Sequence, residues 1–168
     1  DFMVAEADES DASFLLLLPT VAIVTNIDPE HLDHYGTMDR VREAFLNFIN
    51  RVPFYGVAVV GIDNVNVRAL LPSVRKPVVT YGVAADADLR AENIVIDGLS
   101  TRFDVIRRGV ALGPVTIPSP GQHLALNSLA AIGGSRGVGR HGEAATRAVA
   151  AVAGMSRRFK IKGFEGQD

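Results

Sequence analysis

Three short apolar runs, each closed by polar residues, and a fourth strand-like run constrain the fold of this chain more than any other feature. The runs lie at residues 2–5, 21–24, 57–62 and 78–81. Continuous apolar runs of this length are typical of strands buried on both faces, and such strands occur in parallel sheets covered by helices. The pattern therefore predicts an α/β fold with a mostly parallel central sheet flanked by helices.

The segments between these runs predict helices. An amphipathic helix is predicted after Thr37, which can cap its first turn. Its apolar residues recur at three- and four-residue spacing: Met38, Val41, Phe45, Phe48 and Ile49. A shorter helix is predicted from Asn64 to the residue before Pro72, because proline disfavours helical backbone in the residue that precedes it. Strand, helix and strand in this order are typical of a parallel sheet.

Residues 89–118 have a different pattern, which predicts an antiparallel β addition to the sheet. Alternating apolar and polar residues there are interrupted by the turn pairs Asp97-Gly98 and Arg108-Gly109. After this region, helices are predicted at about 123–132 and 143–153. The glycine-rich residues 133–142 between them predict a flexible surface loop. They are not a phosphate-binding loop, because no lysine followed by serine or threonine closes the run.

Composition excludes several classes of protein. The chain of 168 residues is 48% hydrophobic with a net charge of -2, which predicts one globular domain and argues against a nucleic-acid partner. It has no cysteine, which excludes disulfides, thiolate metal sites and cysteine nucleophiles. The longest apolar run is far shorter than the ~20 residues of a membrane helix, so no membrane association is expected. A cytoplasmic location is compatible with all of this.

Polar clusters follow the first two apolar runs, at residues 6–11 and 26–35. Ligands of parallel sheets bind beyond the carboxyl ends of the strands, so neighbouring strands would bring these clusters together. Glu6 and His31 could then share a divalent cation with nucleotide phosphates. The alternative is an acidic helix N-terminus and a solvated histidine, and the residues alone leave both interpretations open.

Several motifs resemble the Mur ligase family. The strings AEADESDASF at 5–14, VAIVTNI at 21–27 and EHLD at 30–33 carry this resemblance. The motifs NF, PFYG, PGQH and RRF follow in the family's order, so the resemblance covers nearly the whole chain. It is closest to the branch that adds L-alanine. Relatives that add later amino acids often have a carbamylated lysine in the helix after the histidine, and residues 38–50 contain no lysine.

The resemblance implies roles for five residues. Glu6 and His31 match the family's magnesium-binding glutamate and histidine. His123 matches the histidine that lies against the adenine of ATP, Asn127 the asparagine that contacts it, and Arg158 the arginine directed at the phosphates. Without the resemblance, Asn127 would be interpreted as a polar residue at a helix start and Arg158 as a solvated charge.

The resemblance also implies a reaction. ATP and magnesium would phosphorylate the carboxylate of UDP-N-acetylmuramate, and the amine of L-alanine would attack the acyl phosphate, in peptidoglycan synthesis. Two alternatives remain: a ligase of the same family that recycles murein tripeptide, and a degenerate nucleotide-binding module without catalysis. The sequence does not indicate the oligomeric state.

The expected domain organisation is incomplete. Residues 1–155 match the central ATP-binding domain without its phosphate loop, and residues 156–168 match a linker to a C-terminal domain. The chain alone is therefore expected to be inactive. Two departures from the family concern Leu124, which replaces a usual asparagine, and the glycines from Gly133, which are expected to loosen a helix at about 1 kcal/mol each.

Overall fold

The computed structural model of the chain describes residues 3–10, 12–30, 32–137, 145 and 147–149. In this part a six-stranded sheet has the order β1-β2-β3-β4-β5-β6. Its strands are β1 (Val21–Val24), β2 (Val57–Gly61), β3 (Val78–Gly82), β4 (Leu89–Asp97), β5 (Ser100–Arg107) and β6 (Val110–Ile117). The helices are η1 (Ser13–Leu16), α1 (Leu32–Tyr35), α2 (Met38–Asn50), α3 (Val65–Leu70), η2 (Leu71–Ser73) and α4 (Gln122–Gly137).

The sheet is parallel in its first part and antiparallel in its second. Strands β1 to β4 pair in parallel, whereas β4, β5 and β6 form consecutive antiparallel hairpins. The fold class predicted from the apolar runs is therefore confirmed, as is the antiparallel addition. The two parts join through a short ladder, in which Tyr81 pairs with Leu89 and Gly82 with Arg90.

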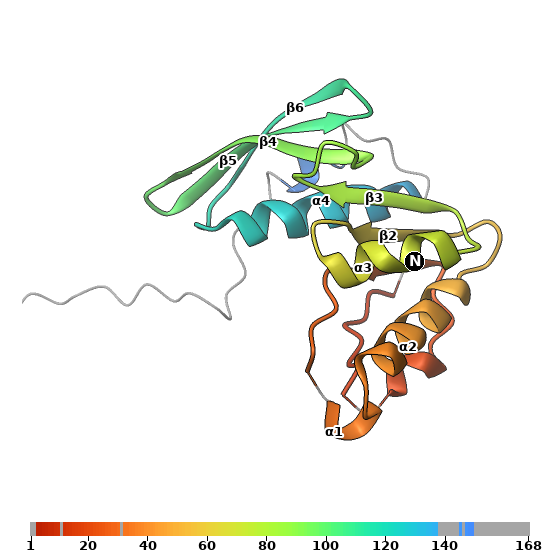
Figure 1. The fold of residues 1–168 in the computed structure, drawn as a ribbon. Coiled ribbons are helices and arrows are strands. Elements are labelled where there is room, and N and C mark those ends of the chain that lie inside the picture. Colours follow the sequence, from red (N-terminus) through yellow and green to blue (C-terminus); the bar gives the residue numbers. More distant parts are fainter. Residues whose placement is uncertain (1–2, 11, 31, 138–144, 146, 150–168) are drawn as a thin grey trace, which may run out of the picture.

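Helices cover both faces of the sheet (Figure 1), with α2 and α3 on one face and α4 on the other. Alternate side chains of β2 belong to two separate apolar clusters. Ala58 and Val60 pack in the cluster that contains α2, whereas Val57 and Val59 pack in the cluster that contains α4. This explains why the sequence of β2 is a continuous apolar run: both of its faces are buried.

Side-chain caps begin the two helices of the first face. Thr37 accepts a hydrogen bond from the backbone N–H of Arg40, as the prediction for α2 required. Asn64 accepts bonds from the backbone N–H groups of Asn66 and Val67 at the start of α3. After α3 the chain does not stop before Pro72 but makes one 3-10 turn, in which proline occupies an early position where its missing N–H costs nothing.

The strand predicted at residues 2–5 is wrong for the residues that the structure describes. Residues 3–5 form no ladder, and Met3 and Val4 are 86% and 96% exposed. A strand is stabilised by backbone bonds to a neighbour as well as by apolar side chains, and no described strand lies beside these residues. An apolar run alone cannot distinguish a paired strand from an extended segment.

The helix predicted to end near residue 132 continues through the glycines to Gly137. Gly133 and Gly134 are buried because α4 lies close to the sheet there. A Cβ on Gly133 would lie 2.8 Å from Cγ1 of Val59, and one on Gly134 would lie 3.2 Å from Cδ1 of Ile23. The expected loop and loosened helix are therefore wrong for residues 133–137, where glycine permits close packing. Residues 138–142 lie outside the described part.

Residues 145 and 147–149 are helical, within the second helix predicted at 143–153; the rest of that range lies outside the described residues. None of the described helices has the length and apolar character needed to cross a membrane.

Candidate functional site

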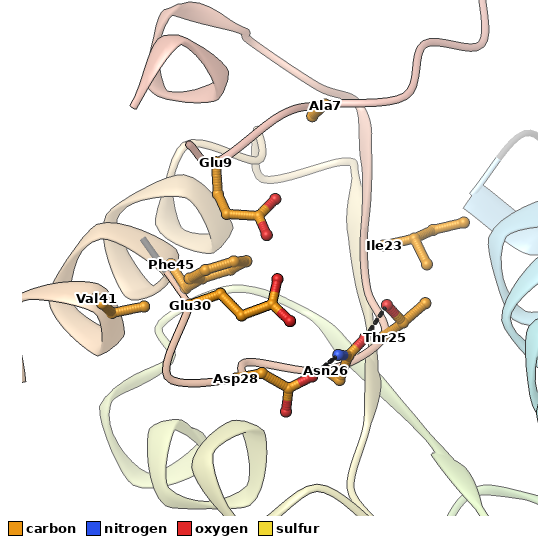
Figure 2. A pocket seen from close by; sticks show the side chains of 9 residues that line it. All are labelled: Ala7, Glu9, Ile23, Thr25, Asn26, Asp28, Glu30, Val41 and Phe45. Atoms are coloured by element: carbon orange, nitrogen blue, oxygen red, sulfur yellow. Dashed lines mark hydrogen bonds between the residues drawn. The ribbon is translucent and has the colours of Figure 1, made fainter. Parts of the chain in front are cut away.

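A hollow of about 200 Å³ lies at the carboxyl end of β1 (Figure 2). Val41 and Phe45 of α2 form an apolar part of its wall, and the carboxylates of Glu9 and Glu30 point into it. The full lining consists of Ala7, Glu9, Ile23, Thr25, Asn26, Asp28, Glu30, Val41 and Phe45. Polar residues from both predicted clusters therefore share one hollow at the sheet edge where parallel folds bind ligands.

Tyr35 joins the two clusters directly. Its hydroxyl donates a hydrogen bond of 2.6 Å to the backbone oxygen of Glu9, 26 residues away in sequence. Tyr35 is buried at the end of α1, and the bond itself is partly buried. The predicted convergence of residues 6–11 with residues 26–35 is confirmed. It arises from this contact and the shared hollow, since residues 3–5 form no strand beside β1.

The structure places only one member of the predicted magnesium pair. Glu6 is exposed on the extended segment that precedes Glu9, and it does not line the hollow. His31 lies outside the described residues, between Glu30 of the hollow and the first residue of α1. Among the described residues, no cluster of three metal-ligating side chains is present. Joint magnesium binding by Glu6 and His31 stays a prediction.

The loop after β1 is fixed to the loop after β2. Asn66 donates through its side-chain amide to the backbone oxygen of Ile27 at 2.8 Å, and Asn64 donates to Asp28 at 3.4 Å. Asn26 also donates to Asp28. The sequence predicted Asn64 only as a helix start and indicated no role for Asn66. Their position shortly after the apolar run at 57–62 was the available signal.

A carboxylate likewise connects the ends of β2 and β3. Asp63 accepts hydrogen bonds from the backbone N–H groups of Val83 at 2.8 Å and Ala84 at 3.0 Å. Burial, with a smaller effect from Asp63, raises the pKa of Tyr81 to about 12. The ends of the three parallel strands are thus joined by hydrogen bonds from side chains that follow β1 and β2.

The other predicted site residues lie at the start of α4. Strand β4 runs parallel to β3, β5 antiparallel to β4 and β6 antiparallel to β5, so β6 points in the same direction as β3. The chain therefore leaves β6 at the sheet edge where the parallel strands end. His123 and Asn127 follow on α4, both exposed and four residues apart, so they share one helix face. Leu124 is partly buried and packs against the core. Arg158 lies outside the described residues.

A family model decides what kind of domain this is. The model of the Mur ligase middle domain matches residues 1–134, which is most of the chain. The chain belongs to the Mur ligase middle domain family. The observed sheet, with α4 against its second face, is thus the described part of a Mur ligase middle domain.

Curated relatives of this middle domain carry a consistent name. It is 50% identical over 163 residues to the UDP-N-acetylmuramate--L-alanine ligase of Anaeromyxobacter dehalogenans, covering 97% of this chain and 36% of that protein. The ligase of the same name from Myxococcus xanthus is also 50% identical over 163 residues, with 97% of this chain and 34% of that protein covered. The chain therefore spans about a third of the length of these relatives.

Solved structures share the fold. A UDP-N-acetylmuramoylalanyl-D-glutamyl-2,6-diaminopimelate--D-alanyl-D-alanyl ligase from Acinetobacter baumannii superposes with a TM-score of 0.77 at 21% identity, over 94% of this chain and 34% of that one. A UDP-N-acetylmuramate:L-alanyl-gamma-D-glutamyl-meso-diaminopimelate ligase from Neisseria meningitides gives a TM-score of 0.73 at 25% identity, over 86% and 43%. Different Mur ligases thus have this middle-domain fold.

Proposed function

We propose that this chain is the ATP-handling middle part of a longer ligase that joins L-alanine to UDP-N-acetylmuramate in peptidoglycan synthesis. The observation that carries the proposal is the 50% identity to L-alanine-adding ligases over 97% of the chain. The whole reaction needs more than this chain, because the matched segment is about a third of those relatives.

The proposed reaction has two balanced steps. The carboxylate of UDP-N-acetylmuramate attacks the γ-phosphorus of ATP, which forms an acyl phosphate and releases ADP. The amine of L-alanine then attacks the acyl carbon, which forms the amide, expels phosphate and loses a proton to solvent or a base. Both steps concentrate negative charge on oxygen atoms, so the protein's task is to position groups and to neutralise charge.

The donor set near the hollow fits magnesium. Magnesium prefers carboxylate oxygens, is bound by one or two protein carboxylates plus phosphates, and keeps several waters. Glu6 supplies an exposed carboxylate, and Tyr35 ties its segment to the histidine loop through Glu9. We propose that Glu6 and His31 hold the cation, which would neutralise phosphate charge when bound.

His123, Asn127 and Arg158 are proposed to bind the nucleotide. The exposed face that His123 and Asn127 share supports contacts with the base, and Arg158 would be directed at the phosphates. We further propose that residues 1–155 belong to the ATP-binding domain and 156–168 to a linker, in a cytoplasmic enzyme. In this organisation the chain by itself has no ligase activity.

The test is phosphate release from ATP by the full-length protein that carries this segment, with UDP-N-acetylmuramate present. L-alanine, murein tripeptide and no amine are compared, and Glu6→Gln and His31→Ala are assayed beside the wild type. Glu43→Gln, which changes an exposed carboxylate of α2, is the matched control.

We expect release that depends on L-alanine, is strongly reduced in the Glu6 and His31 variants, and is unchanged in the control. Release that depends on tripeptide would replace the proposed substrate with that of a recycling ligase. Absence of release with every amine would favour a module without catalysis.

A further inference from the structure

Thr101, at the start of β5, has a fully buried side chain, and apart from tyrosines it is the only buried polar side chain among the described residues. A hydroxyl placed in the core costs free energy unless its hydrogen bonds are made. The partners of Thr101 therefore show what its position requires.

Both partners lie in the turn between β6 and α4. Oγ1 of Thr101 donates to the backbone oxygen of Ser119 at 2.8 Å and accepts from the backbone N–H of Gly121 at 2.9 Å. These two residues flank Pro120, whose ring fixes its own φ angle. One hydroxyl thus holds the turn at two points to a buried strand.

The held turn determines where His123 lies. Gly121 has φ +138°, a backbone conformation that favours glycine, and the ring of His123 packs directly on it. A Cβ on Gly121 would be 2.5 Å from Cε1 and 2.8 Å from Nδ1 of that ring. The backbone oxygen of Gly121 also accepts from the N–H of Leu124 at 3.1 Å, so the same residue starts α4.

We propose that Thr101 is a positioning residue for the nucleotide: through Ser119 and Gly121 it fixes the ring of His123 and the start of α4, and hence Asn127 one turn later. The inference rests on the proposed function, because it takes His123 and Asn127 as contacts of the base. Thr101 itself is fully buried, so it acts through these residues and not by direct contact with a ligand.

The test uses the full-length protein with the variants Thr101→Val and Thr101→Ser. Valine keeps the shape of threonine and removes the hydroxyl, whereas serine keeps the hydroxyl. Val105→Ala is the control: Val105 is fully buried in the same strand, so its truncation lowers stability without touching the turn. For each protein we would measure KM for ATP, L-alanine and UDP-N-acetylmuramate. The affinity for ATP is measured by calorimetry, and the hydrogen exchange rate of the Gly121 amide is measured as well.

We expect Thr101→Val to raise KM and Kd for ATP by about fivefold to tenfold, the range expected for losing a hydrogen bond that positions a contact. KM for the other two substrates should be unchanged, Thr101→Ser should retain near-normal ATP affinity, and Val105→Ala should leave KM for ATP unchanged. A purely structural role would instead reduce the folded fraction and lower kcat without a selective effect on ATP.

An unchanged KM for ATP in folded Thr101→Val, or an equal rise in Val105→Ala, would overturn the proposal. If Thr101→Val does not fold, Gly121→Ala displaces the His123 ring directly, and normal ATP affinity in that variant would overturn it as well. A wild type without amine-dependent ATP consumption would count against the proposed function. Faster exchange of the Gly121 amide in Thr101→Val would still show whether Thr101 holds the turn.

Discussion

Single carboxylates bind the strand ends of this sheet to the loops around them. Asp88, just before β4, accepts hydrogen bonds from the backbone N–H of Thr80 at 3.0 Å, the hydroxyl of Thr80 at 3.1 Å and the guanidinium of Arg108 at 2.7 Å. These bonds bridge β3 and the turn after β5, where the short β3–β4 ladder joins the two parts of the sheet. Removing this carboxylate should weaken that junction.

Asp88 should make stability depend on pH in the acid range. Burial acts to raise the pKa of Asp88, but the bonds from Thr80 and Arg108 outweigh it and hold the pKa below the usual range. The stabilisation is therefore present above the unfolded pKa of about 4, and it is lost as pH falls through the lower folded pKa. Urea unfolding at neutral and acid pH should show that Asp88→Asn has a lower neutral stability and a weaker pH dependence.

The control for Asp88 is Asp39→Asn, because the Asp39 side chain is 90% exposed and pairs only on the surface with Arg42. Surface pairs of this kind contribute little, so its unfolding curves should match the wild type at both pH values. Identical pH dependence in Asp88→Asn and the wild type would contradict the prediction.

Tyr81 should ionise late in an alkaline titration. Burial first, and the nearby charge of Asp63 second, raise its pKa to about 12. Since the folded pKa is raised, this group stabilises the fold below its unfolded pKa of about 10, and the stabilisation is lost as pH rises toward the folded value. Ultraviolet absorbance should resolve a late component of tyrosinate formation that Tyr81→Phe removes. A late component that persists in Tyr81→Phe would disprove the assignment.

At this scale the sequence predicted that two polar clusters meet, but not the individual contacts. Polar residues of both clusters line the hollow at the end of β1, although residues 3–5 form no strand. The hydrogen bonds of Asp63, Asp88 and Thr101 were not predicted. Thr80 lies 8 residues from Asp88, and the other partners, among them Ser119 and Arg108, lie 18 to 21 residues away, so no local pattern indicates these pairings.

Among the elements, α4 is the one whose sequence was most misleading. Glycine lowers helix propensity by about 1 kcal/mol relative to alanine, so the run from Gly133 predicted a loop. The requirement for close packing of α4 on β1 and β2 outweighs that local preference. Strands β1, β2 and β3 and helix α2 were predicted well, because apolar periodicity and a cap agree there with the burial that the fold imposes.

The two glycines of α4 should respond differently to alanine. Gly133→Ala places a methyl group 2.8 Å from Cγ1 of Val59, a fully buried branched side chain, and overpacking of this kind costs about 1–3 kcal/mol. In Gly134→Ala the tightest contact is with the end of Ile23 at 3.2 Å, a flexible side chain that is 43% exposed, and Cγ1 of Val21 lies at 3.5 Å, an ordinary contact distance. At residue 134 the stabilisation from the higher helix propensity of alanine, about 1 kcal/mol, should exceed the cost of this contact.

Chemical denaturation should therefore show a lower free energy of unfolding for Gly133→Ala and an equal or higher one for Gly134→Ala. The two variants are controls for each other, since they add the same group to adjacent residues of one helix. Equal changes in both would mean that the approach of α4 to the sheet is not what selects glycine at 133.

For the whole molecule, the two edges of the sheet differ. On the β6 edge, Pro114 and Gly113 interrupt regular backbone bonding. The β1 edge has the apolar sequence Val-Ala-Ile-Val, and no described strand pairs with β1 on the side that faces away from β2. An unprotected apolar edge strand is a template for pairing with another chain. Association of the isolated chain should therefore occur through β1.

Light scattering of the 168-residue chain on its own should show association that increases with concentration. Ile23→Lys, which places a charge on the exposed side chain of β1, should reduce it. Val110→Lys makes the same change on β6, where Val110 is 64% exposed, and should have little effect. Equal effects of the two substitutions would show that exposed apolar area, not the edge backbone, drives association.

The turn held by Thr101 leads into α4, and Gly133 and Gly134, which pack against the sheet, lie in the same helix. The rotation of α4 about its own axis is therefore fixed at both points. One residue inserted between Asn127 and Gly133 would rotate one end of α4 against the other by about 100°. Either the glycines would turn away from β1 and β2, or His123 and Asn127 would turn away from their side of the domain. Many side chains of this helix are free to vary, but its length between these two points is not.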